Sequence, residues 1–172
     1  MSSQLPQANL QQMRMTMMVI WIALIMGVVT FGIVVIMIGL KGAPGEDLPV
    51  ITYGGIGIAA LMLVLRFFVP DMMARNQFKQ AMQTAKAEGN EDEEEMLGKF
   101  YQIFLTRLII GMALLEGAAF LNLVAVMAEN QPLGFVPVAI LLLAMIASVP
   151  TKSKLDGWIR NQMENYNLEN QN

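Results

Sequence analysis

The feature that most constrains this chain is an uninterrupted apolar segment from Met15 to Leu40, which contains no charged residue. At a rise of about 1.5 Å per residue, a helix of this length exceeds the roughly 30 Å hydrocarbon core of a bilayer. The segment is longer than the apolar region of a signal peptide, about 7–15 residues, and no A-x-A cleavage site follows it. We therefore predict an uncleaved membrane-spanning helix at residues 15–40.

Three further apolar segments predict additional spans. They lie at about residues 50–69, 108–127 and 133–149. Residues 70–107 form the long polar segment and predict a cytoplasmic helical hairpin, which Pro70 is expected to separate from the second span. Residues 151–172 predict an amphipathic interfacial helix anchored by Trp158. The expected fold is therefore all-α, a single membrane domain over residues 1–172 that forms a four-helix bundle with four crossings.

The distribution of Lys and Arg predicts the orientation. Lys41 lies in the first loop, and Arg66 lies near the end of the second span. The other basic residues lie in the N-terminal segment, the long loop and the tail: Arg14, Arg75, Lys79, Lys86, Lys99, Arg107, Lys152, Lys154 and Arg160. Because cytoplasmic segments carry the excess of Lys and Arg, both termini and the long loop are expected in the cytoplasm. We predict a multi-pass protein of the cytoplasmic (inner) membrane.

The composition excludes several classes of chemistry. The chain contains neither cysteine nor histidine, so it has no disulfide framework, no thiolate nucleophile, and none of the usual zinc or haem ligands. No nucleophile–base pair or metal triad can be assembled from the remaining motifs, and no basic stripe indicates nucleic-acid binding. We therefore expect a non-enzymatic protein with no catalytic residues, no metal and no cofactor.

Glu116 is the most informative polar residue of the expected spans. It follows Arg107 by nine residues, which places it about 13 Å into the membrane on a helix. A carboxylate at that depth is protonated, paired or facing a polar interior, so Glu116 is either a structural hydrogen-bonding residue or a proton or cation site. Arg66 either extends to the interface or turns towards Glu116. Asn122 completes this predicted intramembrane polar site and is expected to bond to a neighbouring helix.

Small residues predict surfaces for close helix packing. Such residues let helix backbones approach one another in membranes, where apolar side chains gain nothing by leaving lipid. The predicted packing residues are Gly54, Gly55 and Gly57 on the second span and Ala113 and Gly117 on the third.

Two resemblances concern the stretch RLIIGMALLEGAAFLNLVAVM, from Arg107 to Met127. Together with SVPTKSKLDGWI, from Ser148 to Ile159, it resembles a group of small multi-pass bacterial membrane proteins with an R-x-I-I-G-x-A-L-x-E-G-A-A core. That resemblance covers about the last third of the chain and implies no activity. The stretch is also similar to the carboxylate helix of rotary-ATPase proteolipids, which would make Glu116 an ion-binding carboxylate. This chain differs from them in its much longer polar loop and two extra expected spans.

These observations predict a non-enzymatic membrane subunit or scaffold. It would bind other membrane proteins, or further copies of itself, through its small-residue helix faces, with the lipid bilayer as its other partner. The alternative is a proton- or ion-linked transport component that uses Glu116, with Arg66 as its counter-charge. A transport component needs a polar cavity reaching Glu116, whereas a scaffold needs a Glu116 that water does not reach and an uncovered small-residue face.

Overall fold

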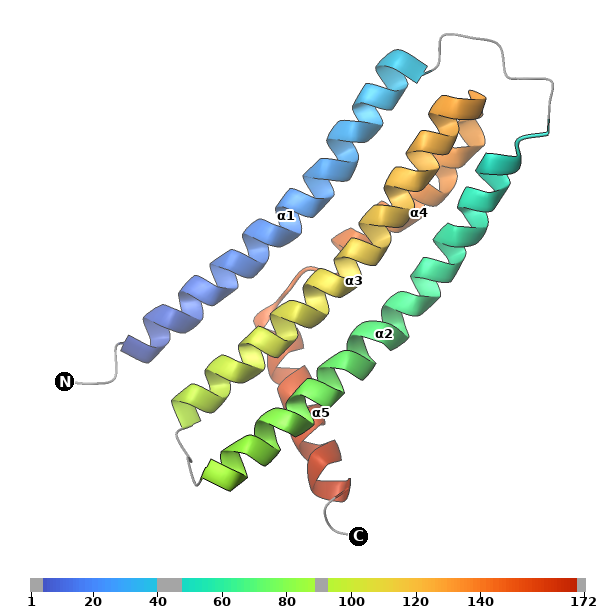
Figure 1. Cartoon of the computed structure of the whole chain (residues 1–172). Helices are drawn as coiled ribbons and strands as arrows, with labels where there is room; N and C mark the ends of the chain where they lie inside the picture. Colours follow the sequence, from blue (N-terminus) through green and yellow to red (C-terminus); the bar gives the residue numbers. More distant parts are fainter. Residues whose placement is uncertain (1–4, 40–47, 89–92, 170–172) are drawn as a thin grey trace.

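The computed structural model describes residues 5–39, 48–88 and 93–169, and these residues form helices joined by short connections (Figure 1). The expected all-α fold is confirmed for this part of the chain, which contains no strand. The helices are α1 (Leu5–Gly39), α2 (Val50–Glu88), α3 (Glu93–Glu129), the single-turn 3₁₀ helix η1 (Pro132–Gly134), α4 (Phe135–Ile146) and α5 (Lys152–Glu169).

Three of the helices are long and apolar enough to cross a membrane. The qualifying segments are Gln12–Ile38 of α1, Val50–Thr84 of α2 and Met96–Glu129 of α3. The predicted fourth span falls on a shorter apolar helix, α4, whose 12 residues extend only about 18 Å. Length and composition therefore support three crossings directly, while the path of α4 decides whether there is a fourth.

Pro70 does not end the second helix, contrary to the sequence-based expectation. α2 continues through Pro70 to Glu88, so the membrane segment and the first arm of the polar hairpin are one helix. Pro70 is buried, and a methyl group on Gly111 of α3 would lie 3.6 Å from its Cγ. Packing against a neighbouring helix offsets the backbone hydrogen bond that a proline removes.

The central position of α3 organises the fold. In Figure 1, α3 lies between α1 and α2, α4 runs beside the C-terminal half of α3, and α5 crosses the other end of α2 and α3 at an angle. One buried cluster joins α3 to α1, α2 and α4 and contains Val28, Val35, Ala59, Met112, Leu115, Leu123, Leu141 and Met145. A second cluster lies at the hairpin end of the bundle, where α2 ends and α3 begins. It joins these two helices to α1 and α5 and contains Met17, Phe78, Phe100, Phe104, Leu155 and Trp158.

The chain turns back sharply after α3. α3 ends at Glu129, and Asn130 adopts a left-handed conformation with φ of 51°, which asparagine tolerates better than most residues. Pro132 then begins η1, which returns close to α3. A methyl group on Gly134 would lie 2.6 Å from Cγ2 of Val126, so this close approach requires glycine and directs α4 back along α3.

Candidate functional site

Side chains from two long helices hold the C-terminal end of α4. The indole N–H of Trp21, on α1, donates to the carbonyl of Met145 over 2.9 Å. The guanidinium of Arg66, on α2, donates to the carbonyl of Ala144 over 2.9 Å and also to the hydroxyl of Ser148. Arg66 thus links α2 to the end of α4.

Lys154, in the first turn of α5, completes this arrangement. Its ammonium donates to the carbonyls of Ala147, over 2.7 Å, and Val149, over 3.3 Å. The last carbonyls of any helix lack intrahelical donors, and leaving them unpaired in lipid is costly. Two cationic side chains and one indole therefore donate hydrogen bonds to the carbonyl groups at the C-terminal end of α4, where the helix dipole also favours positive charge.

The structure does not bring Arg66 and Glu116 together. No ion pair joins them in the part of the chain that the structure describes, because Arg66 is directed towards α4 and Glu116 lies against α1. A methyl group on Gly27 of α1 would lie 3.2 Å from Oε1 of Glu116. Glu116 is half-buried and forms no hydrogen bond with another described residue. Its carboxyl group is therefore without a polar partner within the described chain.

Asn122 lies in a contact between helices. Its side chain is fully buried, and its amide donates to the carbonyls of Gly55 on α2, over 3.0 Å, and of Ala118, over 2.8 Å. A methyl group on Gly55 would lie 2.8 Å from Oδ1 of Asn122. At Gly55, α2 therefore lies so close to the Asn122 side chain of α3 that a larger residue would displace it.

The other predicted packing residues face outwards. Gly54 and Gly57 are exposed, and a methyl group on either would meet nothing within 4 Å. Ala113 and Gly117 on α3 are also exposed, and the same test at Gly117 finds open space. Among these predicted residues, only Gly55 makes a close contact with another helix in the described part of the chain, and within that part α3 keeps an uncovered face centred on Gly117.

Trp158, the predicted interfacial anchor, packs against neighbouring helices. It is 8% exposed, and its ring packs against Phe78 of α2 and Phe104 of α3, with centroids 6.1 and 5.7 Å away. Leu155 and Trp158 of α5 are both buried, and their side of the helix packs against α2 and α3.

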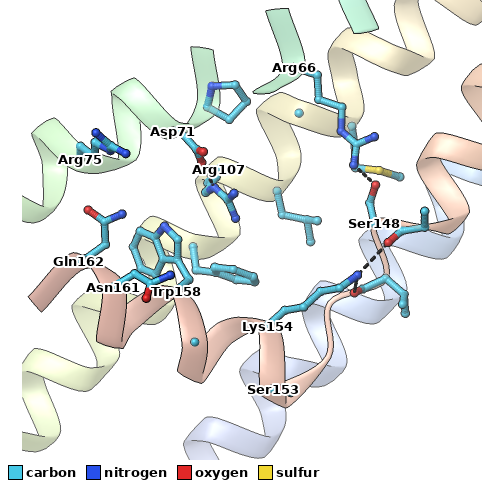
Figure 2. Close-up of a pocket in the computed structure, with 18 of the residues that line it drawn as sticks. Arg66, Asp71, Arg75, Arg107, Ser148, Ser153, Lys154, Trp158, Asn161 and Gln162 are labelled. Atoms are coloured by element: carbon cyan, nitrogen blue, oxygen red, sulfur yellow. Dashed lines mark hydrogen bonds and ion pairs between the residues drawn. The ribbon is translucent and has the colours of Figure 1, made fainter. Parts of the chain in front are cut away.

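A pocket of about 650 Å³ opens between α2, α3 and α5, next to the end of α4 (Figure 2). Basic residues from three helices line it: Arg66 and Arg75 of α2, Arg107 of α3 and Lys154 of α5. Arg107 forms an ion pair with Asp71. Glu116 is not among the residues that line this pocket.

Glu129 has a structural role that the sequence did not reveal. The two oxygens of its carboxylate accept the backbone N–H groups of Ile51, over 2.7 Å, and Thr52, over 2.8 Å. These groups belong to the first turn of α2, where unpaired donors and the helix dipole favour a negative charge. The sequence could not predict this contact, because a cap supplied by another helix leaves no local spacing pattern.

No protein family, curated protein or solved structure matches this chain. The function is therefore argued from the contacts and the exposed faces of the helices, and the two resemblances of the 107–127 stretch contribute nothing to it.

Proposed function

We propose that this protein is a non-enzymatic subunit of the inner membrane that binds a transmembrane helix of another membrane protein on the open face of α3. Glu116 carries this proposal. It lies at the edge of the open face, one position from Gly117 and three from Ala113, and forms no hydrogen bond within the described chain. A half-buried carboxyl group in a membrane needs a polar partner, and a docked helix would supply one.

The geometry of the face fits close packing. Glu116 and Gly117 follow Ala113 by three and four residues, so both lie next to Ala113 on the surface of α3. The open space at Gly117 admits a neighbouring backbone, as small-xxx-small surfaces do. A scaffold needs such an uncovered face beside its polar residue.

We also propose that the chain crosses the membrane four times with both termini in the cytoplasm. α4 begins beside the end of α3, where Glu129 caps the first turn of α2 at Ile51. It ends beside Arg66, which follows Ile51 by fifteen residues along α2. α4 and η1 therefore run about 22 Å along α2. α5 then packs on the hairpin end of α2 and α3 together with Met17 of α1. The chain therefore returns to the end of the bundle where α1 begins, as an even number of crossings requires.

Reporter tags should reveal this topology. Tags at the N-terminus, near Gly89 and at the C-terminus are expected to report the cytoplasm, and a tag near Gly45 the opposite side. The positive-inside distribution and the return of α4 both require this pattern. A C-terminal tag on the side opposite to the N-terminal tag would rule out the fourth crossing.

Substitutions on the open face should separate a scaffold from a transport component. A Cβ atom on Gly117 would meet no described residue within 4 Å, so Gly117→Leu should leave folding intact but reduce the complex seen by native electrophoresis of gently solubilised membranes. Gly57→Leu, an equally open position on the far side of α2, is the matched control. Equal effects of the two leucines would contradict a specific face.

Glu116 variants refine that test. Glu116→Gln retains a hydrogen-bonding group and should keep most of the complex, whereas Glu116→Leu should weaken it modestly, since interhelical hydrogen bonds in membranes contribute about 0.6–2 kcal/mol. If Glu116→Gln instead abolished a proton or cation flux in vesicles while the complex survived, ion-linked transport would replace the scaffold proposal.

A further inference from the structure

The pocket between α2, α3 and α5 is a second site, separate from the open face of α3. Its lining residues include four basic side chains, Arg66, Arg75, Arg107 and Lys154, but only two acidic ones, Asp71 and Glu164. Its volume of about 650 Å³ falls within the range of about 300–1,000 Å³ typical of small-molecule sites. An anion of moderate size would therefore find both space and an excess of positive charge.

The hydrogen bonds within the pocket leave this excess charge in place. Arg66 and Lys154 donate to backbone carbonyls and to a serine hydroxyl, which are neutral acceptors. Arg107 is paired with Asp71, whereas Arg75 has neither an ion-pair nor a hydrogen-bond partner among the described residues. The exposed guanidinium of Arg75 is thus the basic group most available to a bound anion.

Uncharged hydrogen-bond donors also line the pocket. Trp158 lines the pocket and is 92% buried, since it is 8% exposed, yet its Nε1–H group has no hydrogen-bond acceptor in the described chain. Figure 2 draws this nitrogen on the side of the ring that faces α2. Buried donors normally have a hydrogen-bond acceptor, and a ligand in the pocket could supply the acceptor for this N–H group. Asn161 and Gln162 contribute amide groups nearby.

The pocket has an apolar side as well as a polar one. Pro70, Leu108, Met112 and Val149 line it beside the end of α4, while Arg75, Asn161 and Asn165 lie towards the hairpin end. With the membrane placement proposed above, this junction lies at the cytoplasmic boundary of the bilayer. Basic pockets between helices at that level suit the phosphate and the first apolar atoms of an anionic lipid.

We propose that this pocket binds a phosphate group, carried either by the headgroup of an anionic phospholipid or by free inorganic phosphate. Arg75 and Arg107 provide charge-assisted hydrogen bonds to the phosphate oxygens, and Lys154 and Arg66 provide a positive field from the deeper side. The apolar side of the pocket would contact the glycerol and upper acyl carbons of a lipid, whereas inorganic phosphate would use only the polar side.

The test is a titration of the purified full-length protein in a non-ionic detergent. The probes are phosphatidylglycerol, phosphatidylcholine and inorganic phosphate at constant ionic strength, with thermal unfolding and tryptophan fluorescence as readouts. We expect phosphatidylglycerol or phosphate to raise the unfolding temperature, and Arg75→Gln to weaken that binding about fivefold, the effect of one basic residue at an anionic surface. Arg160→Gln, on α5 but outside the pocket lining, should bind as the unmodified chain does.

The arms of the titration distinguish the sources. A response to phosphatidylglycerol alone, sensitive to Arg75→Gln, identifies a lipid headgroup, and an equally sensitive response to inorganic phosphate identifies free phosphate. The proposal is overturned if neither probe binds, or if Arg75→Gln and Arg160→Gln weaken binding equally, because surface charge alone would then account for it. Because the titration needs no partner protein, a negative result would not bear on the proposal that a helix docks on the open face of α3.

Discussion

Gly55→Ala is expected to destabilise the protein, whereas the same substitution at its two neighbouring glycines should not. The added methyl group would lie 2.8 Å from Oδ1 and 3.3 Å from Cγ of Asn122, a side chain that is fully buried and hydrogen-bonded to both α2 and α3. Overpacking of this kind costs about 1–3 kcal/mol. The measurement is thermal unfolding in detergent.

Gly54→Ala and Gly57→Ala are the matched controls. Both positions are open, so alanine there should be neutral or should stabilise α2 by about 0.5–1 kcal/mol. Combining Gly55→Ala with Asn122→Ala removes the obstructing oxygen, and the double variant should be more stable than the sum of the single effects predicts. Equal stability of the three glycine variants would show that α2 and α3 are not in close contact at Gly55.

Arg66→Met should be the other strongly destabilising change. It removes the donors to the Ala144 carbonyl and the Ser148 hydroxyl, and hydrogen bonds from charged groups contribute about 1.5–3 kcal/mol. Double-mutant cycles on the unfolding free energy can identify the side chain to which Arg66 is hydrogen-bonded. Arg66→Met and Ser148→Ala should be coupled, since the two side chains share a hydrogen bond.

The matched cycle combines Arg66→Met with Glu116→Leu. Because the two residues do not contact each other in the described structure, their effects should add within about 0.3–0.5 kcal/mol. A coupling well above that range would mean that Arg66 is the counter-charge of Glu116, and would contradict the role of Arg66 at the end of α4.

The length and apolarity of the helices could be predicted from the sequence, because the cost of unpaired backbone groups in lipid allows few other structures. The faces of those helices could not. In α1, exposed Met26 and buried Val28 are both apolar, because lipid and the protein interior both favour apolar side chains. Hydrophobic periodicity therefore says little about which side of a membrane helix is buried, and so Gly55 could not be separated from Gly54 and Gly57.

The polar contacts were missed for a related reason. The N–H groups that Glu129 caps lie 77 and 78 residues before it in the chain. Arg66 bonds to the backbone carbonyl of Ala144 and the hydroxyl of Ser148, which lie 78 and 82 residues after it. Such partners depend on how α4 folds back, which follows from the close approach at Gly134. A helix–helix hydrogen bond could be predicted for Asn122, because a buried amide in a membrane helix finds few acceptors other than a neighbouring backbone.

Site-specific photo-cross-linking from the open face of α3 tests the proposed function most directly. The chain contains no cysteine, so Gly117→Cys provides a unique attachment point for a benzophenone maleimide, and Met26→Cys, exposed on α1, provides the control. Irradiation of native membranes should yield one adduct of defined mass from position 117, containing a transmembrane helix of another protein, and none from position 26. An adduct yield at position 117 no greater than at position 26 would contradict the docking of a helix on this face.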